Sequence, residues 1–153
     1  MDYKKEIIGI VESEKTAIMM TCIGLLEGIM ENYIWMGTSS LALLKPSLFE
    51  CLKNRKIVLF PDLGIDKTGK GTPFQQWKSK SEAIKAIGCK IAISDLLEKE
   101  GSLIQKYKGF DLADFVIANI LKKYKVLNWL QAKNPVVSHF ISKFDLKLEK
   151  SSG

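Results

Sequence analysis

Histidine and cysteine are scarce in this chain, which has one histidine and three cysteines among 153 residues. The cysteines, Cys22, Cys51 and Cys89, are odd in number and far apart, which argues against both a disulfide framework and a clustered zinc site. Their apolar neighbours predict small core residues. His139 has no partner motif around it, so we interpret it as a surface or core residue rather than a catalytic base.

Long hydrophobic runs are also missing. No stretch approaches the roughly 18 uninterrupted apolar residues that a membrane span requires, and residues 1–6 lack the apolar run of a secretory signal. Apolar residues nevertheless make up 46% of the chain, which is enough for one continuous core. We therefore expect a cytoplasmic protein with no membrane partner.

Acidic residues are outnumbered by basic ones, 17 to 23, and the net charge of +6 is unevenly distributed. Residues 1–44 contain three lysines and six acidic residues, whereas residues 45–100 carry a net charge of +4 and residues 101–153 a net charge of +5. An acidic segment within a basic remainder suits a metal site on a surface that attracts a polyanion. A lysine-rich solvated surface accounts for the charges equally well.

Strand and helix patterns alternate along the chain with short connections. Strands are predicted at 7–11, 33–36, 57–60 and 89–93, and helices at 14–26, 47–52, 72–88 and 111–124. The order predicts an α/β domain over residues 1–125, with a mostly parallel, Rossmann-like sheet of about four strands flanked by helices. Residues 126–153 are predicted to form a basic extension packed on the same domain, with loose final residues.

Three residues follow predicted strands immediately: Glu12, Gly37 and Asp62. In parallel α/β sheets, ligands bind at the carboxyl ends of the strands, where the following loops gather. This shared position is the structural reason to group Glu12 and Asp62 as candidate functional residues.

Four segments carry a resemblance to a known family: Ile10–Ala17 (IVESEKTA), Gly37–Leu41 (GTSSL), Ile57–Gly64 (IVLFPDLG) and Gly109–Phe115 (GFDLADF). In this order and spacing they resemble the motifs of Toprim domains, especially the primase-like members of phages and mobile elements. The resemblance covers roughly residues 6 to 116. It implies a Toprim-like fold.

The resemblance also implies Mg²⁺-dependent phosphoryl transfer on DNA or RNA, with single strands as the expected substrate, in the replication or mobilisation of a mobile element. The enzyme would be a primase-like nucleotidyltransferase or a nuclease. Glu12 would act as the general acid or base and Asp62 as a metal ligand. Mg²⁺ prefers a few carboxylates together with waters and phosphate oxygens, so these residue types suit that chemistry.

The chain departs from the Toprim pattern at Gly64, where a second metal-binding aspartate is expected. Asp66 and Asp114 are the candidates for the missing ligand, and Asp111 is a further substitute. The zinc-ribbon and helicase-binding parts that accompany primases have no counterpart here and would be separate partner domains. A catalytically degenerate nucleic-acid-binding or scaffolding module therefore stays open as the alternative function, and the oligomeric state is not predicted.

Some of the acidic residues have purely structural interpretations. Glu14 would lie in the first turn of a helix, where an acidic side chain stabilises the helix dipole. Asp111 and Asp114 are spaced as a helix N-cap and the partner three positions later, and capping is the favoured role for Asp111.

The segment Gly64–Gly71 offers a third function, that of a nucleotide hydrolase, because it fits the first seven positions of a P-loop. Gly71 takes the place of the Ser or Thr that holds Mg²⁺ in that motif, and Pro73 delays the helix that should begin near the lysine. Lys15, Lys67 and Lys70 remain candidates for contacting phosphates through their charge.

Overall fold

A computed structural model describes the backbone of residues 7–123. The chain divides into two compact units, residues 1–115 and residues 116–153. The sheet and every candidate site residue belong to the first unit. The basic extension predicted for residues 126–153 lies outside the described residues.

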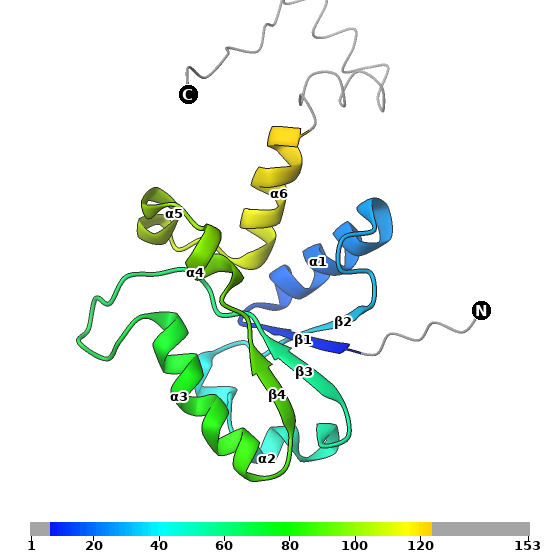
Figure 1. Cartoon of the computed structure of the whole chain (residues 1–153), viewed down its shortest axis with the longest axis vertical. Helices are drawn as coiled ribbons and strands as arrows, with labels where there is room; N and C mark the ends of the chain where they lie inside the picture. Colours follow the sequence, from blue (N-terminus) through cyan, green and yellow to red (C-terminus); the bar gives the residue numbers. More distant parts are fainter. Residues whose placement is uncertain (1–6, 124–153) are drawn as a thin grey trace, which may run out of the picture. The chain divides into compact units, whose positions relative to one another are not determined.

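The first unit is built on a four-stranded, all-parallel sheet, which confirms the predicted α/β class (Figure 1). Its strands are β1 (Ile7–Val11), β2 (Tyr33–Gly37), β3 (Lys56–Leu59) and β4 (Lys90–Ile93), in the spatial order β2-β1-β3-β4. The run of β-branched residues in β1 suits this central position, because a strand covered on both faces has no polar side.

Helices connect the strands and flank the sheet. The α-helices are α1 (Glu14–Glu27), α2 (Pro46–Phe49), α3 (Pro73–Ala86), α4 (Leu96–Glu100), α5 (Leu103–Lys108) and α6 (Leu112–Lys123), and the short 3₁₀ turns are η1 (Leu41–Leu43) and η2 (Glu50–Leu52). Helix α1 lies on one face of the sheet, whereas α2 and α3 lie on the other (Figure 1).

The two long helices of the first unit begin and end where their capping residues predict. At α1, the Ser13 hydroxyl accepts a hydrogen bond from the Thr16 backbone N–H, and Gly28 ends the helix in the left-handed conformation. At α3, Thr72 and Gln75 form the predicted capping box, with Pro73 in the first turn.

Helices α4 and α5, between β4 and α6, are absent from the elements predicted above. A local signal for α5 is nevertheless present in the sequence, because Ser102 and Gln105 have the spacing of a capping box. Both reciprocal hydrogen bonds of that box form, and Gly109 ends the helix with a positive φ of 68°. Helix α4 is only five residues long and has no side-chain cap, so its ends carry no comparable signal.

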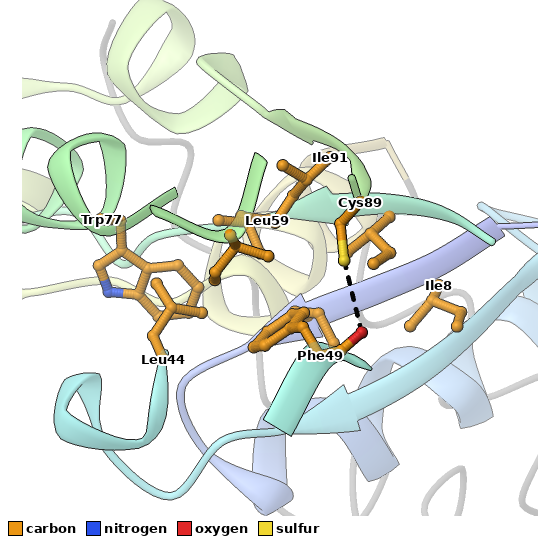
Figure 2. Packing of buried hydrophobic residues seen from close by; sticks show 10 residues of the cluster. Ile8, Leu44, Phe49, Leu59, Trp77, Cys89 and Ile91 are labelled. Carbon is orange, nitrogen blue, oxygen red and sulfur yellow. Dashed lines mark hydrogen bonds between the residues drawn. The ribbon is translucent and has the colours of Figure 1, made fainter. Parts of the chain in front are cut away.

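The main apolar core lies between the sheet and the α2–α3 face (Figure 2). Ile8, Ile57 and Leu59 of the sheet pack there against Phe49 of α2 and Trp77 of α3. All five are at most 4% exposed, so this layer contributes hydrophobic stabilisation to the sheet.

The cysteines only partly follow the prediction of core residues. Cys89 is buried and its thiol donates a hydrogen bond to the carbonyl of Phe49 (Figure 2). Cys22 and Cys51 are exposed, so the prediction is wrong for these two; Cys22 is absent from the buried residues of α1, and in η2 it is Leu52 rather than Cys51 that packs against the core. Among the described residues, no helix is long and apolar enough to cross a membrane.

The strand order creates a switch point between β1 and β3. From β1 the chain crosses by way of α1 to β2 on one side, and it later returns to place β3 on the other side. The two connections lie on opposite faces of the sheet. Ligands of open parallel sheets bind beyond the carboxyl ends of the strands at such a switch point.

Truncation of a core side chain should destabilise the whole first unit. Leu59→Ala is expected to lower the free energy of unfolding by about 2–5 kcal/mol, because Leu59 is fully buried and its removal leaves a cavity. Leu26→Ala, at an 81% exposed position of α1, is the matched control and should change it by less than about 0.5 kcal/mol. Urea unfolding followed by circular dichroism measures both, and equal effects would contradict this assignment of the core.

Candidate functional site at the carboxyl edge of the sheet

Glu12 and Asp62 lie at the switch point. Glu12 follows the fully buried Val11 at the end of β1, and Asp62 follows the buried Phe60 and Pro61 after β3. The backbone N–H of Phe60 donates to the carbonyl of Ile10 over 2.8 Å, so the pairing of the two strands continues up to the residues before Asp62. Glu12 and Asp62 therefore follow two strands that are paired with each other.

The charges of three other carboxylates act on Asp62. Burial of its side chain, followed by the negative charges of Glu12, Asp111 and Asp114, raises the pKa of Asp62 to about 7, against the lowering effect of Lys15. Each of the three acids is therefore close enough to disfavour ionisation of Asp62. The four residues Glu12, Asp62, Asp111 and Asp114 are called the acidic cluster below.

Asp111 links the acidic cluster to α1. Its side chain is buried, and its Oδ2 accepts a hydrogen bond of 2.6 Å from the hydroxyl of Thr16. Lys15 Nζ lies 3.4 Å from the same oxygen. The first turn of α1 thus supplies a hydroxyl, a positive charge and the positive end of a helix dipole to one buried carboxylate.

Asp111 also caps α6, as predicted. Its Oδ1 accepts a hydrogen bond of 2.8 Å from the backbone N–H of Asp114, and the backbone N–H of Asp111 donates in return to Oδ2 of Asp114 over 3.4 Å. The capping role and membership of the acidic cluster are compatible, because the two oxygens of Asp111 have different partners. The sequence pattern favours the first role, and the Toprim resemblance gives Asp111 only as a further substitute for the missing metal ligand.

Glu14 faces the turn after β2 and is not part of the acidic cluster. Ser39 donates a hydrogen bond to its carboxylate, which is the largest cause of the lowered pKa of Glu14. The turn and the helix come together at Gly37, where a Cβ would lie only 2.7 Å from the backbone nitrogen of Glu14. Any larger residue at position 37 would therefore push β2 away from the start of α1.

Gly64, where the Toprim pattern has an aspartate, has a steric explanation. A Cβ at this position would lie 2.8 Å from Cγ of Pro73, the first residue of α3. A side chain at position 64 therefore requires the start of α3 to move. The additional carboxylates near Asp62 come instead from Asp111 and Asp114, at the start of α6.

Asp66, the other candidate ligand, points into its own loop. Its carboxylate accepts hydrogen bonds from the backbone N–H groups of Thr68, Gly69 and Gly71. These bonds lower the pKa of Asp66, and the bond from Thr68 has the largest effect. It is exposed and is not among the charges that act on Asp62. A phosphate-binding loop aims such N–H groups at its ligand, whereas here they bind a side chain of the loop itself.

The three candidate lysines lie in different places. Lys15 contacts the acidic cluster through Asp111. Lys67 lines a pocket beside the loop that contains Asp66, and Lys70 is exposed on the same loop outside that pocket. Their roles towards phosphate remain predictions.

The acidic cluster suits a magnesium ion by its donor chemistry. Within residues 7–120, no group of three or more His, Cys, Asp or Glu side chains has an arrangement that would hold a metal ion. Mg²⁺ is commonly bound through only one or two carboxylates, with water and substrate oxygens completing the shell. Glu12 and Asp62, with Asp114 nearby, fit that smaller requirement.

Comparison with known proteins gives one match. The family described as "Domain of unknown function (DUF6371)" matches residues 1–63, a stretch that contains both Glu12 and Asp62. No curated protein and no solved structure matches the chain. The matched stretch ends before the loop with Asp66 and before Asp111 and Asp114.

Replacing Asp62 should change the dependence of stability on pH. Because the pKa of Asp62 is raised to about 7 in the folded protein, the folded state binds more protons than the unfolded state between about pH 4 and pH 7, and stability falls as the pH rises through this window. Asp62→Asn removes that loss, which is on the order of 2–4 kcal/mol at about 1.4 kcal/mol per pH unit.

Urea unfolding in a chelator-containing buffer, at about pH 5 and about pH 8, measures the difference. The wild type should lose more stability than Asp62→Asn between the two conditions, and Glu100→Gln, at an exposed position, should behave as the wild type does. Identical pH dependence in wild type and Asp62→Asn would contradict the raised pKa.

Proposed function

We propose that this chain is a Toprim-like domain that carries out Mg²⁺-dependent phosphoryl transfer on nucleic acid, as a primase-like nucleotidyltransferase or a nuclease. The observation that supports this most directly is that Glu12 and Asp62 follow adjacent strands at the switch point of an all-parallel sheet, where burial and the neighbouring acids raise the pKa of Asp62 to about 7. The resemblance to Toprim motifs supplies the reaction class.

In this proposal Glu12 transfers the proton of the attacking or leaving oxygen, because it is the half-buried carboxylate at the end of β1. Asp62 would hold the metal ion together with Asp114 or Asp66; Asp114 is the better supported of the two, since its charge acts on Asp62. When bound there, Mg²⁺ would offset the repulsion among the carboxylates and neutralise charge on the phosphoryl group. Lys15 would orient phosphates beside the acidic cluster.

The second candidate is a nucleic-acid-binding or scaffolding module of the same fold without catalysis. The observation that favours it is that Asp66 and Asp114 both make hydrogen bonds within the chain, so neither carboxylate is held ready for a metal ion alone. Both candidates take DNA or RNA as the partner and place the protein in the cytoplasm. In both, zinc-ribbon or helicase functions would come from other domains.

Glu12→Gln should separate the two candidates. Incubated with Mg²⁺, nucleotides and single-stranded DNA or RNA, the wild type is expected to synthesise primers or cleave the strand. The variant should lose activity by about 100-fold or more, the usual contribution of a positioned proton-transfer group. Gel analysis of the products measures the rate, and circular dichroism checks the fold.

Glu31→Gln, at an exposed position between α1 and β2, is the control and should keep the wild-type rate. A titration with Mg²⁺ followed by NMR provides a second readout, with shifts expected near Glu12 and Asp62. The absence of both activity and shifts would exclude the enzyme. Salt-sensitive binding that is unchanged in Glu12→Gln would then support the module.

A further inference from the structure

A basic pocket lies beside the acidic cluster, between the loop that follows β3 and the end of α5. Its volume is about 290 Å³, at the low end of the range of about 300–1,000 Å³ for small-molecule sites. One wall is formed by Gly64, Lys67 and Pro73, and the other by Lys106 to Gly109. The size suits a single nucleotide rather than a dinucleotide.

The two walls are joined to each other. The backbone N–H of Leu63 donates to the carbonyl of Phe110 over 2.8 Å, and the Leu63 side chain is 1% exposed. A Cβ on Gly101, the residue after α4, would lie 2.5 Å from Leu63 Cδ1, so the α4–α5 turn is packed tightly against this side chain. The pocket is therefore an open hollow bounded on two sides by packed segments.

The charge of the pocket is positive. Lys67, Lys106 and Lys108 line it, and none of its described lining residues is acidic. Lys106 is paired with Glu98 over 2.8 Å, whereas Lys67 and Lys108 are exposed and form no ion pair with any other residue of the described part. Asp66, the nearest acid of the loop, binds backbone N–H groups of its own loop. Two lysines thus remain for an anionic ligand.

The pocket also offers a surface for a base. Tyr107 lines it and is 62% exposed, and an exposed aromatic ring beside lysines is the arrangement on which single-stranded bases stack. A buried structural tyrosine would be covered by neighbours. The combination of two lysines and an aromatic ring fits a nucleotide, which has a phosphate and a base, better than it fits inorganic phosphate.

The pocket and the acidic cluster share the same two chain segments. Asp62 directly precedes Leu63, and Asp111 comes two residues after Gly109. Consecutive Cα atoms are about 3.8 Å apart, so the Cα of Gly64 lies within about 8 Å of that of Asp62. A nucleotide in the pocket would place its neighbouring phosphodiester near the carboxylates.

We propose that this pocket binds one nucleotide of a single-stranded nucleic acid, with Lys67 and Lys108 contacting its phosphates and Tyr107 stacking on its base. The proposal rests on the proposed function, because it is the proposed function that makes a nucleic-acid strand the substrate. This role differs from that of a P-loop. Here lysine side chains contact the phosphate, whereas in a P-loop the backbone N–H groups of the loop do so.

The test is the binding of fluorescein-labelled oligo(dT), measured by fluorescence anisotropy with the full chain and a chelator. The double variant Lys67→Ala/Lys108→Ala should weaken binding by about tenfold at low salt and reduce the slope of log K against log salt by about 1.4, since each phosphate contact on a single strand contributes about 0.7. Tyr107→Leu should weaken binding by about five- to tenfold without changing that slope.

The control is Lys78→Ala/Lys90→Ala, which removes the same charge at exposed positions that do not line the pocket. It should weaken binding by less than about threefold, the effect of general surface charge. Equal weakening by both double variants, or wild-type binding in Tyr107→Leu, would overturn the proposal. An excess of thymidine monophosphate should compete with the oligonucleotide, and inorganic phosphate should compete less well; the reverse order would also overturn it.

Failure of the pocket and failure of the proposed function give different results. If binding depends on the pocket residues but Mg²⁺-dependent activity is absent, the proposed enzyme fails and the pocket stands. If activity depends on Glu12 while binding is indifferent to the pocket residues, the enzyme stands and the pocket fails.

Discussion

One buried carboxylate, that of Asp111, holds the functional edge of the molecule together. Its Oδ2 accepts from the Thr16 hydroxyl in the first turn of α1, and its Oδ1 accepts from the N–H of Asp114 in the first turn of α6. Two helix N-termini therefore meet at one negative charge, which their dipoles and Lys15 stabilise. Asp62 lies near the same charge, and burial of its side chain, followed by the charges of Glu12, Asp111 and Asp114, disfavours its ionisation against the opposing effect of Lys15.

Much of the fold follows from local patterns in the sequence. Strand β1 is indicated by its own run of β-branched residues, and the capping residues Ser13 and Thr72 bond to residues three positions away. These effects can be predicted without the rest of the chain. The bond between Thr16 and Asp111 joins residues 95 positions apart, and no local pattern indicates it. For the same reason the pocket wall at α5 could not be predicted from the loop that it faces.

The candidate site illustrates the same division. Glu12 and Asp62 could be grouped from the sequence because parallel strands bring their carboxyl ends to one edge. The further acids could not be chosen from spacing, because Asp66, the nearest in sequence, binds N–H groups of its own loop, whereas Asp111 and Asp114 reach the cluster through the tertiary fold. At position 64, the contact with Pro73 decides against a side chain, and only the packed start of α3 reveals it.

The loop that contains Asp66 has a consequence for the speed of binding. Its aspartate accepts three backbone hydrogen bonds, so the loop has its shape before any ligand arrives. Fixing a residue's backbone costs about 1–2 kcal/mol, and here folding rather than association bears that cost. Binding of a ligand to this loop requires no slow conformational change. The association should therefore follow single-exponential kinetics set by diffusion and electrostatic steering. The wall that the ligand meets is therefore the same in the free and the bound protein.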